Sequence, residues 1–433
     1  MKTGHYHLTG VAGVGMNAIA QALAAVGCQV TGSDRFCDQG HCLDVVGKLA
    51  KAGVRIIPQD GSGISAGTTG LVVSTAIEDD NPDIAAARRL GVPVLHRSAM
   101  LAQIVEGREC IAVAGTSGKS TVTGMIGFIL EQLGADPFVV NGAPVLNWMS
   151  ETSVGNVRIG RSKWCVLEVD ESDRSLLNFH PAWALVTNVS ADHFTLEEST
   201  GLFRQFAAQV TGGVLWGEAG GFEPQLDAGG SRFEFEGASF RVNVPGRHNA
   251  ENARNAAAMC VRLGFKPAEV AKALADFRGI HRRLEVVGRA GGAVVVDDFA
   301  HNPAKIRAAW ETLAPYHERV LAVWRPHGFR PLAVMMDELV ATFREVCRPG
   351  DFLAVLPVFD AGGTANRSVR SEMLVEKLAA AGLPAAAVKD YAEAVEAVAA
   401  RVKPGSAIVT MGARDPDLPR LARNILERVQ GRG

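Results

Sequence analysis

Short apolar runs alternate along the chain with stretches whose hydrophobic residues recur at every third or fourth position. Runs of the first kind predict buried strands, and stretches of the second kind predict amphipathic helices. Strands that alternate with helices form a parallel sheet, and ligands bind at the carboxyl ends of its strands. We therefore predict an α/β protein, with strands in the runs that begin at Tyr6, Val30, Leu71, Val92, Ile111, Trp164, Trp183, Ala293, Val320, Phe352 and Ala407.

Helices are expected between these runs, most clearly at Ser98–Ile104, Val122–Leu133, Ser371–Ala381 and Tyr391–Ala400. The stretch from about 212 to 245 is rich in glycine and contains short alternating segments, which predict a small antiparallel excursion. An alanine-rich helix is expected to follow it.

Composition narrows the class of protein. A chain of 433 residues exceeds a single core, so about two to three domains are expected. The formal net charge of −2 gives no footprint for nucleic acid, and no apolar run reaches the roughly 18–20 residues of a membrane span. Seven cysteines, an odd number, favour a reducing compartment over a disulfide framework. Because the sequence begins without the pattern of a secretory signal, we expect a cytoplasmic protein that binds neither nucleic acid nor membrane.

A Gly-x-x-Gly-Lys-Ser turn lies where the predicted strand Ile111–Ala114 passes into a predicted helix. Backbone N–H groups in such a turn surround phosphate oxygens, the helix dipole adds partial positive charge, and Lys119 adds a full one. The hydroxyl of Ser120 or Thr121 is placed to ligate a magnesium ion shared with the nucleotide. The turn is shorter than the usual Gly-x-x-x-x-Gly-Lys-Ser/Thr motif, because position 113 is Val. It predicts a nucleoside triphosphate site formed by Gly115, Thr116, Ser117, Gly118, Lys119, Ser120 and Thr121.

A second glycine-rich turn, Gly10–Met16, follows the first predicted strand and precedes a helix that runs through Val26. The next strand ends in Asp34, as in the βαβ opening of dinucleotide-binding domains, where glycines admit a diphosphate and the acid lies near a ribose. This turn alone also fits a nicotinamide dehydrogenase, the alternative from another enzyme class. The Lys-Ser turn further along the chain counts against that alternative, since hydride transfer requires no triphosphate site.

Acids and a histidine follow two of the predicted strands. Glu168 ends an otherwise apolar run, and we expect its strand to lie beside the strand that enters the phosphate turn, where a carboxylate can coordinate magnesium. For Glu171 and Asp173, the alternative interpretation is that these acids merely solvate a loop. His193 follows the strand that begins at Trp183, and at that position we expect a second metal ligand or a substrate contact.

With these motifs in view, the chain resembles the Mur ligase family, the ATP-dependent amino-acid ligases of peptidoglycan synthesis. The resemblance spans essentially the whole chain and is carried by Gly10–Met16 with Asp34, Ser74–Ile77, the phosphate turn, Glu168–Asp173, Thr187–His193, Arg247–Asn252, Arg282–Arg283 and Asp297–Pro303. It implies a Rossmann-like UDP-binding domain at residues 1–107, a central P-loop ATPase-like domain at 108–281 and a C-terminal Rossmann-like α/β domain at 282–433. It also implies ATP and Mg²⁺, with UDP-N-acetylmuramate and an amino acid, L-alanine foremost, as substrates of a monomer or homodimer.

The resemblance further implies a role for individual residues. The implied catalytic residues are Lys119, Glu168, His193 and Arg283, of which Lys119 and Arg283 would neutralise the transferring phosphoryl group. The implied magnesium ligands are Ser120, Glu168 and His193. Beyond the phosphate turn, the implied contacts to ATP are His248, Asn249, Asn252, Arg283 and Asp298. The implied contacts to the other substrates are Gly13, Val14, Gly15, Met16, Asn17, Asp34, Ser74, Ala76, Ile77, Asn188 and His301.

Two segments depart from the pattern of the family's alanine-adding members. Those members commonly carry His and Thr where this chain has Ser117 and Ser120, and the hydroxyl at 120 is retained. They also carry Arg directly after the histidine at position 327, where this chain has Gly328 and then Arg330. Handling of the amino acid therefore has alternatives within the family: a recycling ligase that attaches an intact tripeptide, or a paralogue with another acceptor.

Overall fold

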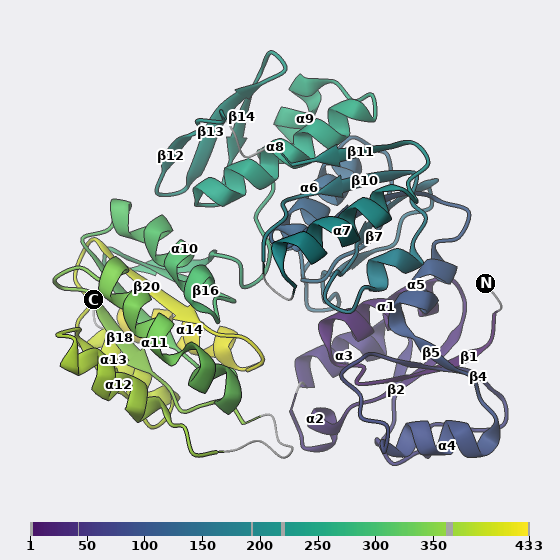
Figure 1. Ribbon diagram of the computed structural model, residues 1–433, viewed down its shortest axis with the longest axis horizontal. Helices are drawn as coiled ribbons and strands as arrows, with labels where there is room; N and C mark the ends of the chain where they lie inside the picture. Colours follow the sequence, from purple (N-terminus) through teal and green to yellow (C-terminus); the bar gives the residue numbers. More distant parts are fainter. Residues whose placement is uncertain (1–2, 42, 192–193, 218–220, 361–366, 432–433) are drawn as a thin grey trace. The chain divides into compact units, whose positions relative to one another are not determined.

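The computed structural model describes residues 3–41, 43–191, 194–217, 221–360 and 367–431 (Figure 1). The chain forms two compact units. The first comprises Met1–Gln225, Arg232–Asn243 and His248–His281, and the second comprises Leu226–Ser231, Val244–Arg247 and Arg282–Gly433. The limits of the three domains predicted from the sequence stay predictions.

The first unit opens with a parallel five-stranded sheet in the order β3-β2-β1-β4-β5. Its strands are β1 (His5–Thr9), β2 (Gln29–Ser33), β3 (Val54–Ile56), β4 (Thr68–Val73) and β5 (Val94–His96). The helices of this segment are α1 (Val14–Ala25), α2 (Arg35–Asp38), α3 (Leu43–Lys51), α4 (Pro82–Leu90) and α5 (Arg97–Ile104). Parallel strands joined through helices place the loops after β1 and β4 at the same edge of the sheet, as the apolar runs predict.

A second sheet of the same unit has the order β11-β10-β6-β9-β7-β8, and only β8 runs antiparallel to its neighbour β7. Its strands are β6 (Glu109–Ala114), β7 (Phe138–Val140), β8 (Val157–Arg158), β9 (Trp164–Glu168), β10 (Trp183–Val186) and β11 (Gly213–Trp216). They are connected through α6 (Lys119–Gln132), the 3₁₀ turn η1 (Ser175–Asn178) and α7 (Leu196–Ala207).

The two sheets of the first unit share one hydrophobic core. Buried residues of β1 and α1, such as Leu8 and Leu23, belong to the same core as Phe138, Leu167 and Phe203 around the second sheet. Helix α1 packs against β7 and β8, and α5 packs against η1. Burial of one continuous apolar surface explains why residues on both sides of position 107 form one unit.

The remaining elements of the chain up to His281 are β12 (Gln225–Asp227), β13 (Gly230–Phe235), β14 (Ala238–Val242), α8 (Arg247–Arg262) and α9 (Pro267–Leu274). Strands β12, β13 and β14 form a small sheet in that order. The predicted excursion from about 212 is therefore wrong in its first part, because β11 pairs parallel to β10 and extends the second sheet.

The second unit is built around a six-stranded sheet in the order β15-β16-β20-β17-β18-β19, with β15 antiparallel to β16. Its strands are β15 (Glu285–Ala290), β16 (Ala293–Asp298), β17 (Arg319–Trp324), β18 (Phe352–Val355), β19 (Ala385–Ala387) and β20 (Ser406–Met411). Its helices are α10 (Pro303–Leu313), the 3₁₀ turn η2 (Ala314–Tyr316), α11 (Phe329–Val346), α12 (Ser371–Ala380), α13 (Tyr391–Ala399) and α14 (Leu418–Gln430).

Both faces of this third sheet are buried. Val294 and Val296 of β16 belong to one hydrophobic core, and Val295 between them belongs to another. Alternate side chains of a strand point to opposite faces, so continuous apolar strands require a helical layer on each face. The expected fold class, α/β with parallel sheets, is confirmed by all three large sheets.

Candidate active site

The phosphate turn joins the end of β6 to the start of α6. Gly115 and Gly118 have φ values of +127° and +82°, which favour glycine, and Gly118 is the residue before the first helical position. A side chain at Gly115 would meet the Thr187 hydroxyl, since a Cβ there would lie 2.1 Å from its oxygen. The backbone N–H groups at the start of α6 are therefore presented by a turn that only glycine can form at this packing density.

Residues after β10 brace the phosphate turn. The Thr187 hydroxyl donates to the Ser117 carbonyl at 2.6 Å, and the Asn188 amide nitrogen donates to the same oxygen at 2.9 Å. The Asn188 side-chain oxygen accepts the Ser117 N–H at 3.1 Å. Asn188, which the family resemblance places at a substrate, therefore lies against the turn. Asn252 of α8 lies on another side of it, because a Cβ on Gly118 would be 2.3 Å from the Asn252 side-chain oxygen.

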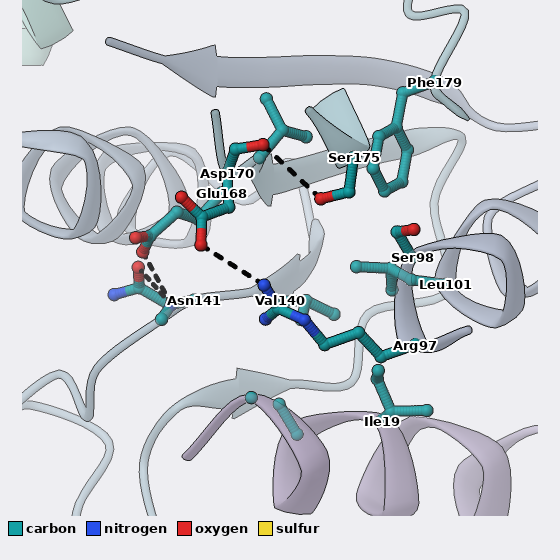
Figure 2. Close-up of a pocket in the computed structure, with 14 residues that line it drawn as sticks. Ile19, Arg97, Ser98, Leu101, Val140, Asn141, Glu168, Asp170, Ser175 and Phe179 are labelled. Atoms are coloured by element: carbon teal, nitrogen blue, oxygen red, sulfur yellow. Dashed lines mark hydrogen bonds and ion pairs between the residues drawn. The ribbon is translucent and has the colours of Figure 1, made fainter. Parts of the chain in front are cut away.

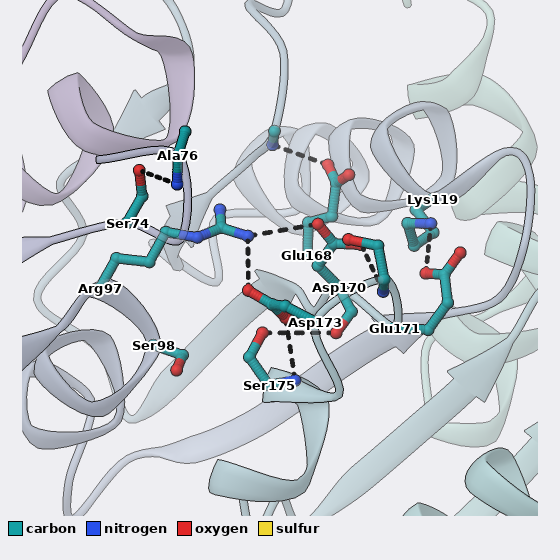
Figure 3. A network of polar contacts seen from close by, with 12 residues as sticks. Ser74, Ala76, Arg97, Ser98, Lys119, Glu168, Asp170, Glu171, Asp173 and Ser175 are labelled. Carbon is teal, nitrogen blue, oxygen red and sulfur yellow. Dashed lines mark hydrogen bonds and ion pairs between the residues drawn. The ribbon is translucent and has the colours of Figure 1, made fainter. Parts of the chain in front are cut away.

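Lys119, the first residue of α6, has an ion-pair partner that the sequence did not single out. Its Nζ lies 2.8 Å from the Gly115 carbonyl oxygen and 2.6 Å from Oε2 of Glu171 (Figure 3). The Glu171 side chain is only 6% exposed, so the interpretation of this acid as a solvated loop residue is wrong. Burial raises the pKa of Glu171, and the neighbouring Lys119 ammonium opposes that rise.

Glu168 ends β9 and lies in register with Val113 of β6. The prediction that its strand lies beside the strand of the phosphate turn is therefore confirmed. Its Oε2 accepts the Gly142 N–H at 2.7 Å, and the adjacent Asn141 donates its side-chain N–H to the Ser120 carbonyl at 3.1 Å. The loop after β7 thus holds both Glu168 and the start of α6, where Ser120 lies.

The oxygen atoms of Ser120 and Glu168 suit a magnesium ion, which prefers hydroxyl, carboxylate and phosphate ligands. His193, the other expected ligand, lies outside the described residues. Among the residues that are described, no three His, Cys, Asp or Glu side chains converge as a metal-binding group. In phosphoryl-transfer enzymes, magnesium takes much of its coordination from the nucleotide and water.

A cavity of about 180 Å³ lies beside Glu168 (Figure 2). Its wall comes from four parts of the first unit: α1 with the glycine-rich turn, the start of α5, the loop after β7, and the segment from the end of β9 to Phe179. Lining residues include Gly15, Ile19, Arg97, Asn141, Glu168 and Asp170. The glycine-rich turn and Glu168, which are far apart in the sequence, therefore line one cavity.

Arg97 lines this cavity and was not singled out from the sequence. Its Nη2 lies 3.2 Å from Asp170 and 3.5 Å from Asp173, as Figure 3 shows. Its Nη1 lies over the glycine-rich turn, 3.0 Å from where a Cβ on Gly15 would be. The guanidinium therefore lies between the glycine-rich turn and the loop of Asp170 and Asp173. A single arginine at the start of a helix gives no sequence signal for that role.

The glycine-rich turn itself shows how the other implied substrate residues are placed. Gly13 and Val14 are exposed, whereas Met16 and Asn17 are buried. Asn17 accepts a hydrogen bond from the Asn156 amide at 2.7 Å. Both Asp34 oxygens accept backbone N–H groups, one from Ala12 at 3.2 Å and one from Phe36 at 2.9 Å, so this acid closes the turn and caps α2.

Two further sets of implied ligand residues are the segment Ser74–Ile77 after β4 and the residues His248 and Asn249 at the start of α8. After β4, the Ser74 hydroxyl accepts the Ala76 N–H at 3.4 Å, one residue before Ile77. In α8, the His248 side chain is exposed and Asn249 is buried. Each set therefore lies at the end of a strand or the beginning of a helix, where backbone groups are open to a ligand.

The second unit carries Arg283, Asp298 and His301 around the end of β16. Asp298 accepts the backbone N–H groups of Leu284 and Ala300, each at 2.7 Å, and burial raises its pKa to about 6. Arg283 lies over the Phe299 ring at 4.9 Å. His301 has its pKa lowered to about 4, mainly by burial and next by the nearby Lys305, so its ring is neutral at pH 7.

Comparison with known proteins accounts for this combination of segments. Residues 5–109 match the Mur ligase family catalytic domain, residues 113–199 the Mur ligase middle domain, and residues 282–414 the Mur ligase glutamate ligase domain. A protein named UDP-N-acetylmuramate–L-alanine ligase from Sinorhizobium medicae is 32% identical, with 95% of this chain and 94% of that protein covered. One of the same name from Symbiobacterium thermophilum is 33% identical, with 100% and 96% covered.

The chain belongs to the Mur ligase family. It therefore has the three-domain α/β architecture of these enzymes and is an ATP-dependent ligase by class. A solved UDP-N-acetylmuramate–alanine ligase from Thermotoga maritima has a TM-score of 0.82 at 24% identity, with 99% of this chain and 100% of that one covered. A murein peptide ligase from Psychrobacter arcticus has a TM-score of 0.65 at 20% identity, with 99% of each chain covered. These two likenesses show that the Mur ligase fold extends over the whole chain.

No helix within the described ranges of this Mur ligase is both long and apolar enough to span a membrane.

Proposed function

We propose that this Mur ligase joins L-alanine to the lactyl carboxylate of UDP-N-acetylmuramate at the expense of ATP, a step in the synthesis of peptidoglycan precursors. The observation that carries the proposal is the cavity between the glycine-rich turn and Glu168, one strand away from the phosphate turn. In the proposal, a diphosphate-linked sugar binds at the glycine-rich turn on one side of this cavity, and a triphosphate binds at the nearby phosphate turn. The relatives named for this activity, at 32–33% identity over nearly the whole chain, support the choice of substrates.

The proposed reaction has two steps. The lactyl carboxylate oxygen attacks the γ-phosphorus of ATP, and the bond between that phosphorus and the β,γ-bridging oxygen breaks. The products of this step are an acyl phosphate and ADP. The amine of alanine then attacks the acyl carbon, and the tetrahedral intermediate expels inorganic phosphate as the nitrogen loses a proton. Neither step needs covalent help from the protein, so positioning and charge neutralisation supply most of the catalysis.

In this scheme the phosphate turn binds the β- and γ-phosphates through backbone N–H groups and the Lys119 ammonium. Arg283 of the second unit would add positive charge at the transferring phosphoryl group. Asp298 and His301 of the same unit would face ATP or the incoming amino acid. His301 is neutral at pH 7, and a pKa of about 4 makes its ring a weak base, so in this scheme it contacts the substrate and does not take the amine's proton.

Ser120 and Glu168 would hold magnesium, together with His193. Bound there, the ion would neutralise charge on the phosphates and on the developing acyl phosphate. The structure supports the fit through the oxygen character of Ser120 and Glu168 and through the hydrogen bonds that tie the loop after β7 to both.

Adenine would lie near His248, Asn249 and Asn252 of α8, and the donor substrate would lie along the exposed backbone of Gly13–Gly15 with the loop of Ser74 to Ile77. Asn188 and Asp34 would act on these substrates through the turns that they hold. A cytoplasmic location and a monomeric or homodimeric state belong to the same proposal, and sedimentation of the purified chain would test the second of these.

The proposal is tested by phosphate release from ATP and magnesium with UDP-N-acetylmuramate and, separately, L-alanine, glycine, L-serine or the tripeptide of the recycling pathway. We expect release that depends on L-alanine. The Lys119→Met variant is expected to lose at least about 100-fold in kcat, because a charge aimed at the transferring phosphoryl group is removed.

Lys163→Met is the matched control, since Lys163 forms an exposed ion pair with Glu109 at 2.8 Å on the same sheet. Release that depends on the tripeptide alone would assign the chain to recycling. Absence of release with every acceptor would overturn the proposal.

A further inference from the structure

The proposed reaction gives no task to Glu171, yet this acid makes the closest ionic contact of Lys119. The Glu171 carboxylate lies 2.6 Å from the ammonium, and the two side chains are 6% and 14% exposed. Both residues are held in place locally: Lys119 begins α6, and the Glu171 carbonyl accepts the Arg174 N–H at 2.9 Å in the turn after β9. The contact therefore joins the phosphate turn to the loop that follows Glu168.

The neighbouring acids of this loop are engaged elsewhere. Asp170 and Asp173 both lie within ion-pair distance of Arg97, at 3.2 and 3.5 Å. Glu171 alone among these three forms a direct ion pair with Lys119, as Figure 3 shows, although the charge of Lys119 also helps to lower the pKa of Asp170. The direct ion pairs of this short loop with arginine and lysine are therefore shared between Arg97 at the cavity and Lys119 at the phosphate turn.

The contact has two physical consequences for a nucleotide at the turn. An ammonium has three N–H donors, of which one is directed to Gly115 and one to Glu171, so one remains for a phosphate oxygen. The carboxylate also offsets the positive charge of the lysine, and in a partly buried site that loss of attraction for an anion is larger than in water. If the Lys119 side chain moved away, the Glu171 carboxylate would be buried without its partner, which is unfavourable in free energy. The pair therefore holds the ammonium in place.

We propose that Glu171 is a positioning residue for Lys119, which fixes the ammonium at the phosphate turn and weakens its attraction for bound nucleotide. The proposal rests on the proposed nucleotide site and extends it. Because Glu171 weakens the binding of ADP as well as that of ATP, it favours product release after each turnover. Nucleotide affinity is lower as a result, while the ammonium stays fixed in position for the transferring phosphoryl group.

The test separates the two effects with two variants. Glu171→Gln keeps an oxygen that accepts the ammonium hydrogen bond but removes the negative charge, so ADP affinity measured by calorimetry is expected to rise about tenfold. Glu171→Ala removes the fixed acceptor as well, so kcat is expected to fall at least about tenfold even when ATP and all other substrates are saturating. Thermal unfolding of each variant shows that the readings come from folded protein.

Glu131→Gln is the matched control, because Glu131 forms a comparable ion pair with Arg158 at 2.8 Å in the same unit, at the end of α6 remote from Lys119. It should leave ADP affinity unchanged. Glu171→Asp withdraws the carboxylate by one methylene group and should give an ADP affinity between those of the wild type and Glu171→Gln, which provides a test independent of the Gln variant's folding.

Wild-type protein that binds no ADP would refute the nucleotide site itself. Wild-type protein that binds ADP, with Glu171→Gln folded and binding no more tightly, would overturn only the role of Glu171. Full kcat in a folded Glu171→Ala variant would overturn the positioning effect in the same way.

Discussion

Glu168 on β9 lies directly opposite Val113 on β6. Val113 is two residues before Gly115, where the phosphate turn begins. This register places the carboxylate beside the start of α6 and not merely on the same sheet. The relationship follows from the strand order, in which β9 is the direct neighbour of β6.

Glu168→Gln is expected to raise the magnesium concentration for half-maximal activity about tenfold or more, because an amide oxygen carries no charge for the ion. Activity should recover in part at high magnesium. Titration of phosphate release with magnesium measures this, with Glu109→Gln at the opposite end of β6 as control. An unchanged magnesium requirement would exclude Glu168 as a ligand.

Gly115→Ala is expected to destabilise the protein by well over the cost of the backbone conformation alone, since its Cβ would lie 2.1 Å from the Thr187 hydroxyl. Gly134→Ala is the control, because Gly134 has a φ of +74° and an open environment. The control should lose about 1–2 kcal/mol of unfolding free energy. Urea denaturation compares the two, and equal losses would mean that the contact with Thr187 is relieved at little cost.

Arg97→Met is expected to raise the KM for UDP-N-acetylmuramate about tenfold, with a smaller change in the KM for ATP. The guanidinium lies over Gly15 of the glycine-rich turn, and loss of a charged hydrogen-bond donor costs ~1.5–3 kcal/mol. Initial rates at varied donor concentration measure this effect. Arg88→Met, which breaks an exposed ion pair with Asp79, serves as control. A larger effect on ATP than on the donor would contradict the assignment.

His301 is expected to make stability rise with pH between about 4 and 6.5. Its pKa is about 4 in the folded protein and near 6.5 when unfolded, so the unfolded state binds more protons in this window and acid favours unfolding. Replacement by Gln should therefore lessen the loss of stability between pH 6.5 and pH 4. Urea denaturation at several pH values measures it.

Asp298 acts in the opposite sense and must be separated from His301. Its pKa of about 6 exceeds the ordinary value of 3.8, so the folded state retains a proton that the unfolded state has lost, and stability falls as pH rises through this interval. The His301→Gln profile is therefore compared with that of Asp298→Asn, whose slope should change with the opposite sign. Slopes that change with the same sign would contradict one of the two assignments, and the sign itself would show which one.

Local patterns determined much of this protein from the sequence alone. The apolar runs predicted eleven strands of the three large sheets, but not β3, β7, β8, β11, β15 or β19. Helices α12 and α13 begin at the predicted Ser371 and Tyr391. The phosphate turn was recognisable because its function resides in consecutive residues, with glycines, Lys119 and a hydroxyl at fixed spacing. Glu168 stood out as an acid in an otherwise apolar strand.

Only the tertiary structure decided which distant side chains meet. Lys119 and Glu171 are 52 positions apart, and Arg97 and Asp170 are 73 apart. Their contacts depend on sheet order and on how α5 packs, neither of which is encoded in a local pattern. For the same reason Glu171 looked like a solvated acid, although its side chain is only 6% exposed. Sequence specifies where charged groups stand along the chain, whereas packing specifies which opposite charge each one meets.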